Sequence, residues 1–72
     1  MHYTYVLIRG KGEWYIGFTN DLKRRVSEHK KQYECSLVYY EAYSSEKLAR
    51  DRERKLKNYG SAWRALRKRI TA

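Results

Sequence analysis

Two apolar runs separated by a short polar stretch predict a β-hairpin at the start of the chain. Residues 3–9 (YTYVLIR) and 13–18 (EWYIGF) are rich in the aromatic and β-branched side chains that favour strands. Residues 9–12 (RGKG) stand between them, and their two glycines indicate a turn. A third apolar run, 37–43 (LVYYEAY), is too short for a long helix and is bounded by polar residues. We therefore expect it to join the hairpin as a third strand.

Helical spacing predicts a first helix over residues 21–32. Leu22, Val26, His29 and Tyr33 recur at intervals of three and four, which places them on one face. Asn20 is the expected N-cap, and Asp21 carries the charge that the positive end of the helix dipole favours.

Two further helices are predicted after the third strand. Ser44 and Ser45 cap a helix over residues 46–58 that ends near Gly60; its apolar positions are Leu48, Ala49 and Leu56. A short last helix begins at Ser61, and its apolar face consists of Ala62, Trp63, Leu66 and Ile70.

This order of elements, ββαβαα, predicts an α+β fold. A three-stranded, mainly antiparallel sheet is marginal alone, so helices must cover it. Seventy-two residues allow a single domain, which we expect to span residues 1–72. A hydrophobic share of 42% supports a folded core.

The charge balance indicates a polyanionic partner. Seventeen Lys and Arg against eight Asp and Glu give a formal net charge of +9. One cysteine, Cys35, excludes an internal disulfide, and together with two histidines it cannot complete a four-ligand structural zinc site. The chain also lacks an apolar run of membrane-spanning length and a signal-peptide pattern. We therefore expect a soluble, cytoplasmic protein with no membrane partner.

Two charged residues fall on apolar helix stripes. Arg25 shares a face with Leu22, and Glu53 lies between Ala49 and Leu56. A partly buried charge needs a partner, a ligand or an open cleft. The two side chains either pair as a structural salt bridge or serve a functional site.

The second strand favours the functional interpretation. Tyr5 and Tyr15 lie in the two hairpin strands, and Gly17 interrupts the second one. A glycine inside a strand is typical of a β-bulge or of a close approach of another group to the backbone.

These residues resemble the GIY-YIG endonuclease superfamily from about Tyr3 to Leu56. The second motif is present as Tyr15-Ile16-Gly17, and the first is degenerate, with Tyr3-Thr4-Tyr5 carrying its tyrosine. The helix signature follows as TNDLKRRVSEH over residues 19–29, and ARDRERKLK over 49–57 matches the stretch around the metal-binding glutamate. The chain is most similar to the small stand-alone, single-domain branch related to the N-terminal nuclease domain of the bacterial excision-repair incision protein.

The resemblance implies a catalytic set of Tyr5, Tyr15, Arg25, His29 and Glu53. Glu53 would bind a divalent metal, Mg²⁺ or Mn²⁺, which prefers carboxylate oxygen. Arg25 would hold the phosphate and offset charge in the transition state. Tyr5, alone or with Tyr15, would orient or deprotonate the attacking water. To act as a base at neutral pH, the phenol needs a nearby metal or Arg25 to lower its pKa. His29 would relay a proton or bind phosphate.

Some of these side chains have a plain packing alternative. Tyrosines in strands are usually half-buried, and Tyr39, Tyr40 and Tyr43 are assigned to the core. His29 is equally well explained as a hydrogen-bonded core residue. Trp14 and Phe18 either stack on unpaired bases or pack internally. Cys35 is expected to have no chemical role.

The basic residues on the predicted helices indicate contacts with a phosphate backbone, giving salt-dependent and largely sequence-independent affinity. The nucleic-acid-binding candidates are Lys23, Arg24, Lys30, Arg50, Arg54, Lys57, Arg64, Arg67 and Lys68.

Three functional hypotheses follow. The first is a metal-dependent endonuclease that hydrolyses DNA phosphodiester bonds with low sequence specificity, in DNA repair or processing. The second is a catalytically weak nucleic-acid-binding module on the same fold. The third is a protein-interaction domain whose basic surface meets an acidic partner. The sequence leaves open the oligomeric state and the choice between DNA and RNA.

Overall fold

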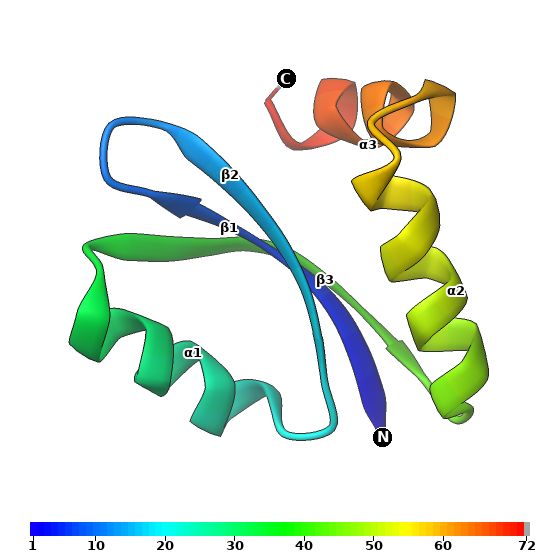
Figure 1. Ribbon diagram of the computed structural model, residues 1–72, viewed down its shortest axis with the longest axis horizontal. Helices are drawn as coiled ribbons and strands as arrows, with labels where there is room; N and C mark the ends of the chain where they lie inside the picture. Colours follow the sequence, from blue (N-terminus) through cyan, green and yellow to red (C-terminus); the bar gives the residue numbers. More distant parts are fainter. Residues whose placement is uncertain (72) are drawn as a thin grey trace.

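The computed structural model describes residues 1–71 and contains a three-stranded sheet with three helices (Figure 1). The strands lie in the order β2-β1-β3, and both pairs are antiparallel. The predicted ββαβαα order and α+β class are thus confirmed. The elements are β1 (His2–Arg9), β2 (Glu13–Thr19), α1 (Leu22–Gln32), β3 (Cys35–Tyr43), α2 (Glu46–Lys57) and α3 (Ser61–Ile70).

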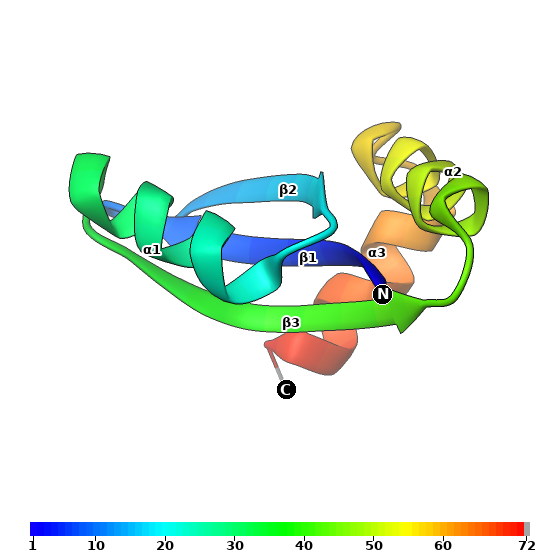
Figure 2. The same ribbon diagram turned by 90° about the horizontal axis from the view of Figure 1, so that it is seen from below.

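The helices lie on opposite sides of the sheet. Figures 1 and 2 show α1 on one face, while α2 and α3 gather on the other. The hydrophobic core lies on the α2–α3 side, where Val6 and Ile16 from the sheet pack with Leu56, Trp63 and Leu66 from the helices. This arrangement confirms the predicted apolar face of α3, since Ala62 and Ile70 pack against the same cluster.

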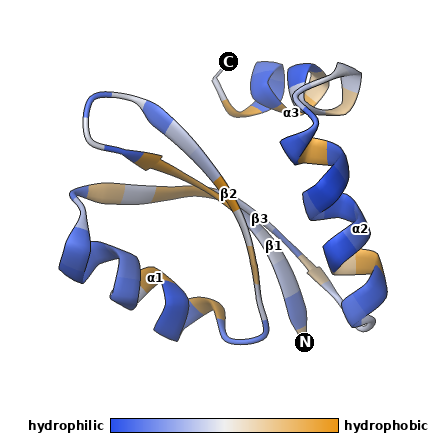
Figure 3. Cartoon of the chain, in the orientation of Figure 1, coloured by the Kyte–Doolittle hydropathy of each residue, from blue (hydrophilic) through white to orange (hydrophobic). Residues whose placement is uncertain are grey.

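Helix α1 contributes little to this core. None of its residues is fully buried, and Figure 3 shows it hydrophilic along most of its length. Its N-cap is Asp21 and not the expected Asn20, because the Asp21 carboxylate accepts the N–H of Arg24 at 3.1 Å. The helix therefore begins one residue later than predicted, at Leu22.

Two residues assigned to the core are exposed. Leu48 is 53% exposed because α2 turns Ala49 toward the sheet, where the Ala49 carbonyl accepts the Thr4 hydroxyl at 2.6 Å. Tyr40 is also 53% exposed, since it lies on the outer strand β3 beside an open hollow of about 540 Å³ next to α1. The predicted cap of α2 is confirmed, because the Ser45 hydroxyl accepts the N–H of Leu48.

A polar cluster joins β3 to α2. Glu41 receives two hydrogen bonds from Arg52, at 3.0 and 3.2 Å, and one from the hydroxyl of each of Tyr39 and Tyr43. Burial of Glu41 alone would raise its pKa, but these four hydrogen bonds and the Arg52 charge lower the pKa below its usual value. Tyr39 and Tyr43 thus serve the structure through their hydroxyl groups as well as through apolar packing.

Candidate active site

The glycine of β2 makes room for a tyrosine of β1. Tyr5 and Gly17 are opposite each other in the β1–β2 pair. A Cβ atom on Gly17 would lie 2.5 Å from both Cζ and Oη of Tyr5, far inside van der Waals contact. The predicted close approach to Gly17 is therefore confirmed, and the group that approaches is the Tyr5 hydroxyl. Tyr5 itself is only 1% exposed.

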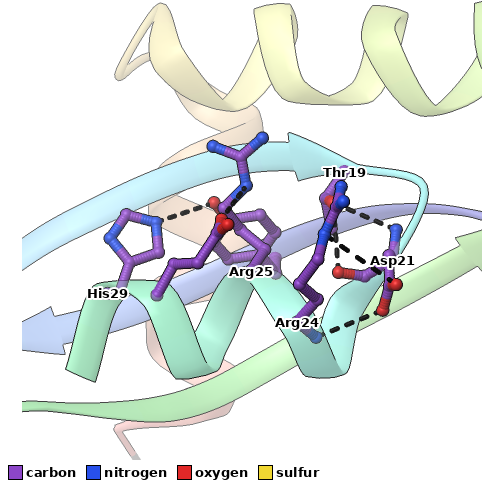
Figure 4. A network of polar contacts seen from close by, with 7 residues as sticks. Thr19, Asp21, Arg24, Arg25 and His29 are labelled. Atoms are coloured by element: carbon purple, nitrogen blue, oxygen red, sulfur yellow. Dashed lines mark hydrogen bonds and ion pairs between the residues drawn. The ribbon is translucent and has the colours of Figure 1, made fainter. Parts of the chain in front are cut away.

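That hydroxyl lies in a cluster with His29 and Tyr15. Tyr5 Oη and His29 Nε2 are hydrogen-bonded at 3.0 Å. The His29 ring packs against both tyrosines, with centroid distances of 5.9 Å to Tyr5 and 4.9 Å to Tyr15. Figure 4 shows the second ring nitrogen of His29 facing away from the Tyr5 bond. His29 thus connects the buried phenol to the outer surface of the site.

Arg25 reaches the same place from the preceding turn of α1. Its side chain is 43% exposed, and its Nε lies 3.6 Å from the Glu28 carboxylate, too far for a hydrogen bond. Arg25 and His29 line an open hollow of about 390 Å³, together with Glu28, Lys31 and Gln32. Figure 4 shows the Arg25 guanidinium extending away from α1. The exposed part of this side chain can meet an anion that enters the hollow, whereas Nε is buried beside Glu28.

Glu53 approaches the cluster from α2. Its side chain is 21% exposed, and its carboxylate pairs with Lys57 of the same helix at 3.2 Å. Within residues 1–71, Arg25 and Glu53 form no ion pair with each other, so a structural salt bridge does not explain their position. Both charges act on Tyr5: Arg25 lowers the pKa of its phenol and Glu53 raises it. Of the five predicted catalytic residues, Tyr5, Tyr15 and His29 are in direct contact, and Arg25 and Glu53 act on Tyr5 through their charges.

The pKa shifts separate the roles of Tyr5 and His29. Burial, followed by the neighbouring Tyr15, raises the pKa of Tyr5, and the opposing effect of Arg25 is too small to reverse this. The expected lowering does not occur, so Tyr5 is protonated at neutral pH. Burial and the charges of Arg25 and Arg9 lower the pKa of His29, against the effect of Glu28. His29 is therefore a neutral imidazole at pH 7.

Glu53 fits the predicted metal ligand. Residues 1–71 hold no cluster of three or more His, Cys, Asp or Glu side chains, which excludes a closed protein cage in this part of the chain. Mg²⁺ suits a site with one carboxylate, because it keeps several waters and takes substrate phosphate oxygens as further ligands. The partly exposed carboxylate of Glu53 meets this requirement once Lys57 releases it.

All nine predicted nucleic-acid-binding residues are exposed. They do not form one continuous face, because α1 lies across the sheet from α2 and α3 (Figure 2). Arg50 and Arg67 have local partners, since their guanidinium groups lie over Phe18 at 4.4 Å and Trp14 at 5.7 Å. Trp14 also packs edge-on against Trp63, and Phe18 stacks on His2 with ring centroids 6.2 Å apart, which favours the packing interpretation of both Trp14 and Phe18.

Arg9 belongs to the site but was missed. Its guanidinium is held between the rings of Tyr15, at 4.7 Å, and Tyr33, at 4.6 Å, and it binds Glu13 at 2.7 Å. Its charge reaches His29. The strand period could have revealed it, because Arg9 follows Tyr5 by four residues and hence faces the same side of β1.

The fold and this cluster agree with the family to which the sequence points. The GIY-YIG catalytic domain model matches residues 1–69, and the chain belongs to this family of nuclease-type domains. No helix within residues 1–71 has the length and apolar character to cross a membrane.

Two similar proteins come from a small group within this class. The chain is 30% identical to a UPF0213 protein of Haloquadratum walsbyi, over 81% of this chain and 75% of the relative. It is also similar to the solution NMR structure of a UPF0213 protein from Bacillus halodurans, with a TM-score of 0.65 and 26% identity. That match covers 97% of this chain and 82% of the other. The resemblance to small stand-alone GIY-YIG proteins is thereby confirmed.

Proposed function

We propose that this protein is a metal-dependent endonuclease that hydrolyses phosphodiester bonds, with DNA as its substrate. The observation that supports it best is the hydrogen bond between Tyr5 and His29, seated against Gly17. Arg25 and Glu53, one cationic and one anionic, act on the same phenol from different helices. Nucleophile activation, phosphate binding and metal binding thus have separate residues at one place.

His29 is the proton acceptor in this proposal. We assign the imidazole proton to Nε2, which then donates to Tyr5 Oη at 3.0 Å, so that the lone pair of Nδ1 takes a proton from the attacking water. The resulting hydroxide attacks phosphorus, the bond to the leaving oxygen breaks, and that oxygen takes a proton from solvent. Tyr5 fixes the ring of His29, and Tyr15 packs against the same ring. The lowered pKa of His29 suits this role because it keeps the imidazole neutral.

Arg25 binds the scissile phosphate. A guanidinium donates two parallel hydrogen bonds to phosphate oxygens and stabilises the charge that develops on them during the reaction. Its side chain is 43% exposed, so the outer part of the guanidinium is open to substrate, while Nε is buried beside Glu28 within residues 1–71.

Glu53 holds the metal ion. A bound Mg²⁺ or Mn²⁺ would supply Lewis-acid stabilisation of phosphate oxygens. The role of Glu53 is to offer one anionic oxygen on a rigid helix, and Lys57 keeps that carboxylate paired when no metal is bound.

The test compares two carboxylates on α2. In a single-turnover cleavage assay with Mg²⁺, Glu53→Gln should lose activity by about 100-fold or more. Asp51→Asn removes the same charge from the same helix at a side chain that is 30% exposed, and it should stay within about threefold of wild type. Both variants should keep the wild-type melting temperature to within about 3 °C. The proposal fails if the wild type leaves single-stranded, duplex and branched DNA uncut in both Mg²⁺ and Mn²⁺.

The second candidate function is a catalytically weak nucleic-acid-binding module. Two observations favour it: Tyr5 is buried, and Lys57 neutralises Glu53. On this alternative Glu53→Gln binds DNA more tightly because a negative charge is removed, and EDTA changes no product. A nuclease shows the opposite response to EDTA, since chelation of the metal stops cleavage.

A further inference from the structure

The junction between α2 and α3 holds a tyrosine in an unfavourable backbone conformation. Tyr59 has φ of 56°, in the left-handed region that favours glycine. Its N–H donates to the Leu56 carbonyl at 3.0 Å, which closes the end of α2. The chain places Gly60 one position later, so the strained position carries a bulky ring. Because the left-handed conformation is unfavourable for a residue with a bulky side chain, the Tyr59 ring is a candidate for a functional role.

The ring is exposed and firmly supported. Tyr59 is 55% exposed, the second most exposed large aromatic or aliphatic residue after Met1 within residues 1–71. It packs edge-on against Trp63, with ring centroids 6.1 Å apart, and Trp63 packs in turn against Trp14 at 5.4 Å. Because Trp63 belongs to the buried core, Tyr59 presents an aromatic surface on a rigid base.

Three cations shortly precede this ring in the sequence, at positions 54, 55 and 57, and Arg54 pairs with Asp51 at 3.3 Å. An open hollow of about 510 Å³ at the end of α2 is lined by Arg54, Lys55, Lys57 and Asn58. Lys57 also pairs with Glu53 at 3.2 Å, so the hollow adjoins the candidate active site. An exposed aromatic ring next to a line of cations is the arrangement that binds single-stranded nucleic acid, in which bases stack and phosphates meet positive charge.

We propose that Tyr59, with Arg54, Lys55 and Lys57, binds an unpaired nucleotide next to the cleaved bond. We call these four residues the α2–α3 corner. The base stacks on Tyr59, and the neighbouring phosphates contact the three cations. This inference rests on the proposed function and refines it, because it specifies DNA with an unpaired segment as the substrate class. A base inside an intact duplex cannot offer its face to Tyr59.

The experiment measures DNA binding without cleavage. Fluorescence anisotropy in EDTA follows a labelled single strand of about 15 nucleotides and a blunt duplex of equal length. Tyr59→Asn removes the ring while asparagine still tolerates the left-handed conformation. We expect it to weaken single-strand binding about tenfold and duplex binding less than twofold, and Tyr59→Phe to stay within about twofold of wild type for both.

Tyr40→Asn is the matched control. Tyr40 is 53% exposed, nearly the same as Tyr59, but it lies beside α1 in the separate hollow on the other side of the sheet. Its substitution should change single-strand affinity by less than about twofold. The cations act through charge, so Arg54→Gln should reduce the slope of log affinity against log salt by about 0.7, and Tyr59→Asn should leave that slope unchanged.

Three results would overturn the inference: unchanged single-strand affinity in Tyr59→Asn, an equal loss for duplex and single strand, or an equal loss in Tyr40→Asn. If the wild type cleaves DNA and Tyr59→Asn leaves single-strand affinity unchanged, this inference falls and the nuclease proposal stays intact. If the wild type never cleaves DNA but Tyr59→Asn weakens single-strand binding, the nuclease proposal falls, and the α2–α3 corner remains as a binding site for unpaired nucleotides.

Discussion

The two sides of the sheet use similar residues in opposite ways. On the α2–α3 side, Glu41, Arg52, Tyr39 and Tyr43 bond to one another, and the Glu41 carboxylate accepts four hydrogen bonds. On the α1 side, tyrosines also meet charged residues, but the Nε atom of Arg25 has no hydrogen-bond partner within residues 1–71. The first group satisfies itself, whereas in the second Arg25 meets Glu28 only at 3.6 Å and leaves 43% of its side chain exposed.

This difference separates stability from chemistry. A saturated polar cluster fixes the geometry of its elements, and removal of one member leaves the other polar groups unpaired. An unsaturated cluster beside an open hollow contributes less to folding and can bind an anion. The tyrosines alone do not distinguish the two sides, since both contain them.

Gly17→Ala should have a large effect on both the cleavage rate and the stability. The added Cβ would lie 2.5 Å from Tyr5 Oη, so the ring must shift and its bond to His29 must change. A displacement of this size can reduce a reaction rate about 100-fold. Single-turnover cleavage measures the loss, and thermal unfolding measures an accompanying destabilisation of about 1–3 kcal/mol.

Gly60→Ala controls for the loss of a glycine. A Cβ at Gly60 would meet only the Asn58 side chain at 3.9 Å, and its φ of −93° suits any residue. If both variants cleave DNA equally well, the close contact of Tyr5 with Gly17 has no role in the reaction.

The next effect is a pH dependence on the α1 side. The pKa of His29 is lowered from its ordinary value of 6.5, so the imidazole stays neutral as pH falls to that value and is protonated only below it. Since a protonated His29 cannot accept a proton, the cleavage rate should be constant above pH 6.5 and fall about tenfold per pH unit below the His29 pKa.

Arg9→Met sharpens this prediction. Removal of the Arg9 charge should raise the pKa of His29 and move the acid limb of the rate profile to higher pH. Lys31→Met removes a charge from the hollow that Arg25 and His29 line, but Lys31 does not affect the pKa of His29. This control should leave the acid limb in place. Identical limbs in wild type and Arg9→Met would argue against His29 as the proton acceptor.

The smallest effect on cleavage is expected from the Glu41 cluster between β3 and α2. Glu41→Gln should lower the free energy of unfolding by about 1–2 kcal/mol, less than for a fully buried pair because Glu41 and Arg52 are 19% and 27% exposed. The cleavage rate of the folded protein should not change. Urea unfolding and a cleavage assay on the same sample measure both quantities.

The same variant should also lose acid sensitivity. The pKa of Glu41 is lowered in the folded protein, so its contribution is present above the ordinary value of 4.5 and disappears as pH falls through the folded pKa. The stability difference between wild type and Glu41→Gln should therefore shrink as pH falls below that value. A gap of constant size at acid pH would show that Glu41 is not bonded as an ionised carboxylate.

Much of the fold could be predicted from local patterns. The hairpin and the apolar face of α3 follow from strand and helix periods, and each is set by residues near one another in the sequence. The exposure of Leu48 and Tyr40 could not, because it depends on where a helix sits on the sheet and where it leaves strand β3 uncovered. The choice of Asp21 over Asn20 as the N-cap could not be predicted either, because it depends on the local backbone conformation that brings the Asp21 carboxylate to the N–H of Arg24.

The site divides in the same way. Gly17 carried a local signal, and the positions of Arg25 and Glu53 on apolar stripes marked them as unusual. Their actual partners, Glu28 and Lys57, are set by side-chain conformations that no spacing rule separates from a mutual pair. The raised pKa of Tyr5 depends on burial by elements distant in sequence. The left-handed backbone of Tyr59 was missed because glycine, the usual signal for it, comes one residue later.

The most direct test of the chemical role of the α1 side is the single-turnover cleavage rate of Arg25→Ala beside that of Arg69→Ala. Both changes remove one arginine from a helix, and Arg69 is exposed on α3, across the sheet. We predict a loss of about 100-fold to 1,000-fold for Arg25→Ala and less than about threefold for Arg69→Ala, with similar melting temperatures. Equal rates in the two variants, at measurable wild-type activity, would contradict the account.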